Sequence, residues 1–445
     1  MLTKQQAKKI CDKVLGFSKA AQTEVILTDT DSALTRFAKN TIIQNVSTKG
    51  IDLSARVTAG KCVGRASTNC LDDASLKAMV QQAIAQAKAE RPGAEIPPMV
   101  GPRKYQKVDN FREATAALTP EARADAVAYI AGKCRAANVE CAGAHSSSTG
   151  IMVLANSKGM FAYDLGTNAE FSVTVLTADS AGWAEGANRD CTKIDTQRLC
   201  DVAFDKAMKS RNPQPIAAGE YTVVLEPAGV TDFLMYMARG FSAQAMQDGT
   251  SFLTGRMGKK VLGENITITD DAYNPEITGL PFDFEGTPRQ SLVLVEKGVP
   301  KNLVYDLKSA KKDKTKSTGH ALPQPNTIGG YPTNLIVDAG NSSLEEMIKT
   351  TKKGLLVTHF HYTNLAERRE VVLTGMTRDG LFMIENGEVA RPVTNMRFTE
   401  STLRALSNVE LISRDRIFAQ AFFGGGFLVP AMKINKFNFS SETKF

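Results

Sequence analysis

The chain has 445 residues, more than one hydrophobic core usually supports, so two domains are expected. Its 42% hydrophobic and 23% charged residues are typical of a globular protein, and a net charge of +7 is too small for this length to indicate nucleic-acid binding. The sequence has no apolar run of the roughly 18 to 20 residues that span a bilayer, and no apolar signal segment at its start, so we expect a cytoplasmic protein.

The first 90 residues predict a unit of two helices that flank several strands. Residues 3–19 predict an amphipathic helix, with Thr3 and Gln6 in capping-box spacing. A second helix is predicted around residues 76–87. Alternating residues between them predict strands at 24–28, 41–47, 51–57 and 62–67, with turns at 48–50 and 59–60.

The same order of elements recurs after a proline-rich connection. Thr119 is predicted to cap a helix that begins at Pro120, and another helix is predicted at 195–209. Strands are predicted between them at 141–148, 151–156 and 161–177. The repeated order could reflect two similar units, 1–90 and 111–210, and the sequence Asn-Pro-Gln-Pro at 212–215 predicts a boundary between domains 1–212 and 213–445.

The second domain opens with the stretch that looks built to hold a site. A short strand around Val223 and Val224 precedes Pro227, and a helix is predicted at 228–247. Its apolar residues, spaced by three and four, are Val230, Phe233, Leu234, Met237, Ala238 and Phe241. Strands are then predicted at 291–297, 335–338, 354–360, 371–374 and 381–385, with helices at 343–351 and 400–406. We therefore expect an α+β protein, with antiparallel strands in the first domain and a mainly antiparallel, barrel-like β structure in the second.

All seven cysteines precede residue 201, in no Cys-x-x-Cys spacing: Cys11, Cys62, Cys70, Cys134, Cys141, Cys191 and Cys200. An odd number without a metal-binding spacing favours buried, reduced thiols in a reducing compartment.

The helix at 228–247, followed by Asp-Gly-Thr-Ser at 248–251, resembles the TldD/PmbA family, also called modulator of DNA gyrase. Pieces at 283–287, 317–321, 354–357 and 384–389 resemble the same family in the same order. TldD-type members carry His-Glu-x-x-x-His on this helix, and here Leu234, Met235 and Arg239 occupy the three functional positions. The resemblance is closest to the PmbA or TldE branch, which lacks the metal motif.

The chemistry of these replacements argues against a zinc site on the helix. Leu234 has no donor atom, and the guanidinium of Arg239 keeps its proton and has no lone pair to offer. No glutamate remains there to activate water. TldD-type members also supply a cysteine ligand near the C-terminus, whereas residues 422–426 read Phe-Phe-Gly-Gly-Gly. We predict no catalytic residue and no metal in this chain, and the resemblance implies zinc in a TldD-type partner.

Three histidines remain to be assigned: His320, His359 and His361. His359 and His361 share one face of a predicted strand, so they could bind a metal with His320 or Asp283 as a further ligand. The alternative is that these histidines cap loops or line a polar cleft. By the family resemblance the strand of His361 lies beside the helix of Arg239, so Arg239, His320 and His361 are predicted to contact substrate.

The resemblance implies a metal-free subunit of a cytosolic metallopeptidase system. Such a subunit pairs with a TldD-type protein, with itself, or with both, and supports proteolysis of unfolded or leader peptides. Extended peptides can bind independently of their sequence by adding a strand to a sheet edge. Two alternatives stay open: a stand-alone peptide-binding or regulatory pseudoenzyme, and a metallohydrolase that uses His359 and His361. Whether the chain is itself an enzyme is therefore left undecided.

Overall fold

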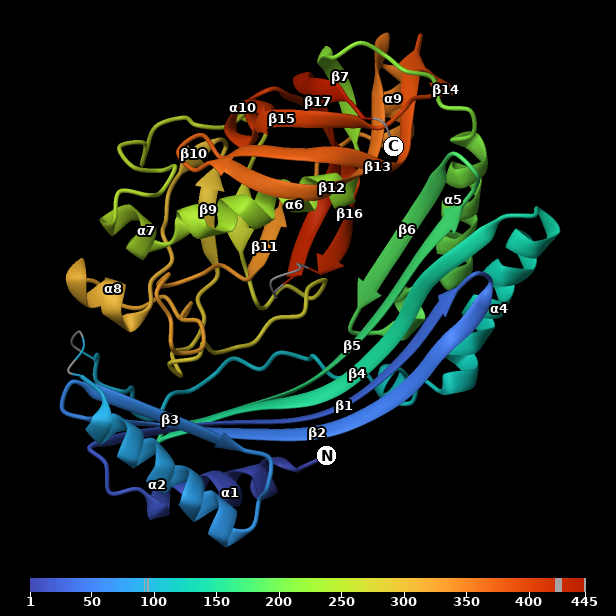
Figure 1. Cartoon of the computed structure of the whole chain (residues 1–445). Coiled ribbons are helices and arrows are strands. Elements are labelled where there is room, and N and C mark those ends of the chain that lie inside the picture. Colours follow the sequence, from blue (N-terminus) through green and yellow to red (C-terminus); the bar gives the residue numbers. More distant parts are fainter. Residues whose placement is uncertain (92, 94–95, 421–425, 444–445) are drawn as a thin grey trace.

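A computed structural model describes residues 1–91, 93, 96–420 and 426–443 of the chain. The chain forms two sheets (Figure 1): a curved sheet built from the first half, and a larger sheet built from the second half. Helices α1 (Lys4–Phe17) and α2 (Asp73–Ala89) cover one face of the curved sheet, and the larger sheet lies over its other face. The predicted α+β class is confirmed. Among the described helices, none is long and apolar enough to cross a membrane.

The first sheet is antiparallel throughout and has the order β3-β2-β1-β4-β5-β6. Its strands are β1 (Gln22–Ala38), β2 (Thr41–Ala59), β3 (Cys62–Thr68), β4 (Glu140–Asn156), β5 (Phe161–Leu176) and β6 (Ala181–Asn188). β1 and β4 pair at the centre, from Glu24 opposite Asn156 to Phe37 opposite Gly143. β1, β2 and β3 therefore lie on one side of the central pairing between β1 and β4, and β4, β5 and β6 lie on the other side.

Two pairs of helices cover the two ends of one sheet face (Figure 1). They are α1 (Lys4–Phe17) with α2 (Asp73–Ala89), and α4 (Pro120–Ala136) with α5 (Thr196–Lys209), while α3 (Glu113–Ala116) and the 3₁₀ turn Cys191–Lys193 are short. The predicted capping box of Thr3 and Gln6 is present, and the Thr119 side chain accepts a hydrogen bond from the backbone N–H of Ala122. The helix starts were thus predicted correctly.

The predicted turn at 48–50 is wrong, because β2 runs through it. Lys49 lies opposite Asp31, and Gly50 lies opposite Thr30 on β1. The hairpin turns instead at Lys39 and Asn40, whose φ angles of 49° and 60° lie in the left-handed region. Both long strands pass through polar stretches because each pairs with a neighbour over its length, which a local pattern does not reveal.

Two glycines let helices approach the outer strands closely. A β-carbon at Gly64 of β3 would lie 1.9 Å from the carbonyl oxygen of Ala83 in α2, and one at Gly182 of β6 would lie 2.2 Å from that of Ala203 in α5. We expect Gly64→Ala and Gly182→Ala each to lower the free energy of unfolding by about 1–3 kcal/mol, because backbone must move. The measurement is chemical denaturation.

Gly132→Ala in α4 is the matched control for these substitutions. A β-carbon there meets nothing within 4 Å, so alanine is expected to stabilise the chain by roughly 0.5–1 kcal/mol. Equal destabilisation at all three positions would contradict the close-approach explanation.

The second sheet follows the path β10-β9-β8-β11-β17-β15-β13-β12-β7, with β14 on β13 and β16 on β17. β7 also pairs with β17, so β17, β15, β13, β12 and β7 form a closed ring. β7–β12 and β11–β17 are parallel, and the other pairs are antiparallel. The strands are β7 (Gly219–Leu225), β8 (Ile268–Asp270), β9 (Leu292–Glu296), β10 (Val299–Pro300), β11 (Asn334–Val337), β12 (Lys353–Glu367), β13 (Val372–Glu385), β14 (Glu388–Pro392), β15 (Met396–Ser401), β16 (Val409–Gln420) and β17 (Gly426–Glu442). Short helices α8 (Leu307–Lys312), α9 (Leu344–Lys349) and α10 (Thr402–Ser407) connect them.

The helix predicted at 228–247 is broken into α6 (Pro227–Ala238), a 3₁₀ turn (Arg239–Phe241) and α7 (Ala243–Gln247). A ring carbon of Phe252 lies 2.2 Å from where a β-carbon of Gly240 would be, and Ser242 is extended, with its hydroxyl donating to the carbonyl of Ile328 at 2.8 Å. Tertiary packing therefore interrupts a periodic sequence. The predicted apolar stripe is nevertheless buried in the main core.

The cysteine prediction is correct for four of the seven residues. Cys11, Cys134, Cys141 and Cys200 are buried and free. The remaining cysteines are also free, but Cys70 is exposed and Cys62 and Cys191 are half-buried. Burial was overestimated because all three lie at strand or turn ends, outside the helix–sheet cores.

Candidate functional site

A cavity of about 570 Å³ lies between the outer strand of the first sheet and the closed ring of the second. β6 contributes Trp183, β12 contributes His359 and His361, and β13 contributes Arg378 and Asp379. We call this cavity the interdomain cleft. It combines aromatic, imidazole and charged side chains from both halves of the chain.

Strand alternation places the two histidines in the cleft. Phe360, between them, points into the barrel core, where its ring packs against Phe233 of α6 at a centroid distance of 6.1 Å. His359 and His361 therefore face the opposite side of β12, as alternate residues of a strand must. The hydroxyl of Tyr236 on α6 donates to the carbonyl of Thr363, which fixes the helix against the same strand.

His359 is held from two sides. Its Nε2 lies 3.0 Å from Oδ2 of Asp379, and its ring stacks on the indole of Trp183, with centroids 4.4 Å apart and an interplanar angle of 23°. Because a carboxylate only accepts, Nε2 carries the donated proton, and Nδ1 is left as the acceptor in the neutral ring. Arg378 Nε stands 3.7 Å from the other Asp379 oxygen. The indole and imidazole thus form a flat, oriented platform.

Two further carboxyl groups lie close enough for their charges to interact with His359. Burial raises the pKa of Asp232 on α6 to about 6, although a hydrogen bond from Thr363 at 2.6 Å opposes the rise. Partial desolvation in the space between the sheets raises the pKa of Glu185 on β6 to about 7, with Glu170 and Asp232 adding to the rise and His359 opposing it. Both carboxyls take up protons near neutral pH.

The raised pKa of Glu185 predicts a pH-dependent stability. The pKa of the Glu185 carboxyl is 4.5 in the unfolded chain and about 7 in the folded chain, so the folded chain binds the carboxyl proton more tightly. The stabilisation that this proton contributes is therefore complete below pH 4.5 and is lost as pH rises through about 7. We expect Glu185→Gln to raise the melting temperature at about pH 8 and to change it little at about pH 5. We expect the rise in melting temperature to be modest, because the Glu185 side chain is solvent-accessible and its charge is screened.

Thermal unfolding at the two pH values checks this prediction. Glu388→Gln, on exposed β14, is the control and is expected to shift neither value. A melting temperature that changes equally at both pH values would contradict an interaction that depends on ionisation.

His361 is neutral at physiological pH. Burial lowers the pKa of its imidazole, and the charges of Arg378 and His359 lower it further, against the opposing charge of Asp379. A neutral ring offers one donor and one acceptor. His361 can therefore hydrogen-bond a polar ligand, such as a peptide group, without supplying charge.

Of the three predicted substrate residues, only His361 lines this cleft. Arg239 is exposed on the turn after α6 and does not line the interdomain cleft. His320 is fully buried, with Nδ1 2.9 Å from Thr318 Oγ1 and Nε2 3.0 Å from Asp270 Oδ1. Both its nitrogens are therefore engaged within the protein, so the interpretation of His320 as a substrate contact is corrected to a buried structural role.

The residues at the family's metal positions do not fit zinc. Leu234 is 1% exposed within the apolar core, Met235 packs partly against it, and Arg239 is a cation. In the described ranges, no group of three or more His, Cys, Asp or Glu is arranged to hold a metal ion. The pair His359 and His361 thus lacks a third ligand there, and His359 Nε2 already donates to Asp379. Residues 421–425, where the family's cysteine would be sought, lie outside the described part.

Trp183, Asp379, Glu185 and Asp232 were not predicted as site residues. Trp183 is the single tryptophan of the chain and lies in a strand of small and polar residues, which was a usable signal. The acidic residues gave no such signal, because their positions depend on β6 of the first sheet packing against β13 of the second and on Trp183 stacking against His359 of β12.

The structure of this chain is similar to solved structures of two proteins along almost its whole length. TldE from Thermococcus kodakarensis matches with a TM-score of 0.88 at 20% sequence identity, over 98% of this chain and 99% of that chain. A Thermotoga maritima protein described as a modulator of a DNA gyrase matches with a TM-score of 0.84 at 18% identity, over 98% of this chain and 100% of that one. The fold is therefore of the TldE type.

The chain belongs to the PmbA/TldD metallopeptidase family. The PmbA/TldA metallopeptidase C-terminal domain matches residues 218–441, domain 1 matches 23–87 and the central domain matches 104–209. A metalloprotease PmbA homolog of Haemophilus influenzae is 26% identical over 445 residues, covering 95% of this chain and 94% of the relative. A metalloprotease TldD homolog of Buchnera aphidicola is 26% identical over 286 residues, 59% of this chain and 58% of that one. The chain spans about half the length of some relatives that it matches.

Proposed function

We propose that this chain is the metal-free, peptide-binding subunit of a cytoplasmic PmbA/TldD peptidase system, and that a TldD-type subunit supplies zinc and hydrolysis. The observation that carries the proposal is the occupation of the three metal-motif positions, two on α6 and one on the turn that follows it, by leucine, methionine and arginine within a family fold. In such a pair this chain contributes recognition of unfolded or leader peptides. The homodimer is the corresponding assembly in the absence of a TldD-type partner.

The cleft supports peptide binding in two ways. β6 is the last of the described strands of its sheet, so among these strands one edge of its backbone has no partner and can hydrogen-bond an extended chain. The platform of Trp183 and His359 offers apolar area beside it, and neutral His361 offers a donor and an acceptor. These contacts depend little on peptide sequence, which suits unfolded substrates.

The test compares hydrolysis of an unstructured fluorogenic peptide by this chain, by a TldD-type protein, and by an equimolar mixture. We expect no hydrolysis by the chain alone and a gain on mixing that a chelator abolishes. Chelator-sensitive hydrolysis by the purified chain alone would overturn the proposal. No gain on mixing, together with peptide binding by the chain alone, would favour a stand-alone regulatory protein.

A further inference from the structure

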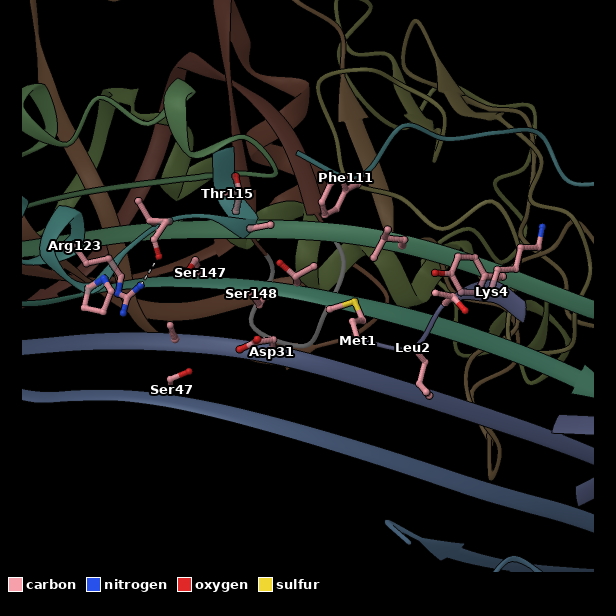
Figure 2. A pocket seen from close by; sticks show the side chains of 18 residues that line it. Met1, Leu2, Lys4, Asp31, Ser47, Phe111, Thr115, Arg123, Ser147 and Ser148 are labelled. Carbon is pink, nitrogen blue, oxygen red and sulfur yellow. Dashed lines mark hydrogen bonds between the residues drawn. The ribbon is translucent and has the colours of Figure 1, made fainter. Parts of the chain in front are cut away.

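The helix-covered face of the first sheet turns polar at its centre, between the N-terminal ends of α1 and α4. A cavity of about 680 Å³ lies there (Figure 2). Two rows of side chains form its floor: Ser47–Ala33–Ser147 across β2, β1 and β4, and Asp31–Thr149 across β1 and β4. On one side of this floor the sheet residues are apolar and pack under α1 and α2, and on the other side they are apolar and pack under α4 and α5. A polar floor between two apolar cores is a surface that the fold does not use for packing.

Arg123 of α4 lines this cavity and is the largest fully buried side chain, at 1% exposure. Its Nε donates to Thr35 Oγ1 at 3.1 Å, Nη1 to the carbonyl of Leu118 at 3.0 Å, and Nη2 to Asn45 Oδ1 at 3.5 Å. All three acceptors are neutral. Within the described ranges, no carboxylate lies at ion-pair distance from this guanidinium.

The positive charge of the buried Arg123 guanidinium therefore lacks a counter-charge among the described residues. Burying a charge costs several kcal/mol unless a counter-charge and hydrogen bonds compensate it. Burial accordingly lowers the pKa of Arg123, and the charge of Glu121 opposes that shift. A guanidinium carries five N–H donors, and the three acceptors leave some of them unused. Carboxylate and phosphate match the geometry of these donors.

The rest of the cavity favours an anion with a polar body. Figure 2 shows Ser147 and Ser148 along β4 beside Arg123, and the hydroxyls of Ser47 and Thr149 also line the space. Asp31 places a carboxylate on the floor, but its Oδ2 lies 3.1 Å from Lys49 Nζ, which offsets its charge. Lys4 adds a cation at the far end.

We propose that this cavity binds a small organic anion, a carboxylate or a phosphate ester, whose oxyanion takes the unused N–H groups of Arg123. The cavity's volume falls in the range of roughly 300–1,000 Å³ found for small-molecule sites. The site is separate from the interdomain cleft: β5 and β6 pair so that Ala184 faces the helices, and Trp183 therefore points to the opposite face of the sheet. The inference goes beyond the proposed function and does not depend on it.

Isothermal titration of the full-length chain tests the proposal. Succinate and inorganic phosphate are the two probes, with ionic strength held constant by sodium chloride. We expect saturable binding of at least one of them, and their relative affinity distinguishes a carboxylate from a phosphate ligand. Arg123→Gln should weaken binding at least tenfold. Arg135→Gln, an exposed arginine on the same helix, should leave it unchanged.

A second variant keeps the test decisive if Arg123→Gln fails to fold. Ala33 stands between Ser47 and Ser147 on the floor, so Ala33→Leu fills the cavity and leaves the charge in place. It should also weaken binding at least tenfold. Absence of binding by the wild type at millimolar succinate and phosphate, or undiminished binding by the folded variants, would overturn the proposal.

Discussion

Replacing Asp270 by alanine is expected to lower the free energy of unfolding by roughly 3–5 kcal/mol, because it leaves buried cationic or polar partners uncompensated. Asp270 is fully buried, and it accepts hydrogen bonds from His320 Nε2 at 3.0 Å and from the backbone N–H of Asn334 at 2.9 Å. Arg289 Nη1 stands 3.8 Å away. This one carboxylate joins β8, β11 and the loop of His320.

The pH dependence of the Asp270 effect has a definite sign. Burial alone would raise its pKa, but the charge and hydrogen bond of His320, with Arg289, hold the pKa below the ordinary 3.8. The stabilisation is therefore present above pH 3.8 and is lost as pH falls through the lower, folded value. Chemical denaturation at neutral pH measures the effect. Asp338→Ala, at the exposed residue that follows β11, is the control, and a similar loss there would show that charge removal alone destabilises the chain.

Trp183→Ala is expected to weaken binding of an unstructured peptide about thirtyfold, close to the 2 kcal/mol of a typical aromatic hot spot. The substitution removes the indole that stacks on His359 and leaves that imidazole with Asp379 alone. Anisotropy of a labelled peptide gives the affinity. Since Trp183 is the single tryptophan, its emission reports on the cleft directly and should shift when peptide binds.

Two controls separate stacking from general damage. Trp183→Phe keeps an aromatic ring on His359 and should retain most of the affinity. Tyr362→Ala removes a ring that is 77% exposed and outside the cleft, and it should have no effect. Tight peptide binding without any change in tryptophan emission would place the peptide elsewhere on the molecule.

Local signals in the sequence predicted the helix starts and several strands well. Thr3, Gln6, Thr119 and Pro120 act within one helical turn, so their pattern alone determines where those helices begin. The polar run from Asp29 to Ser32 hid the second half of β1, because its strand conformation comes from pairing with β2 and β4 rather than from its own residues. Non-local pairing was the information that the sequence pattern lacked.

The candidate site shows the same difference between features set by local sequence and features set by non-local contacts. Alternation along β12 predicted that His359 and His361 share a face, and the structure confirms it. His320 looked equally available in sequence, yet Asp270, fifty residues earlier, accepts its proton inside the core. Trp183 and Asp379 both contact His359 and line one cavity only because the two halves pack together. Contacts between residues of the two halves of the chain could not be predicted from local sequence patterns, because they depend on the tertiary structure.

The central pairing of β1 with β4 also bears on how the first sheet opens. Amide hydrogens on β1 and β4 lie between neighbours on both sides, so their exchange with solvent requires that the sheet separate into its two units. Amides on β3 and β6, at the outer edges, can exchange through local fraying. Exchange should therefore slow from both edges toward the middle, and the central pair of β1 and β4 should be the last part of this sheet to lose its protection.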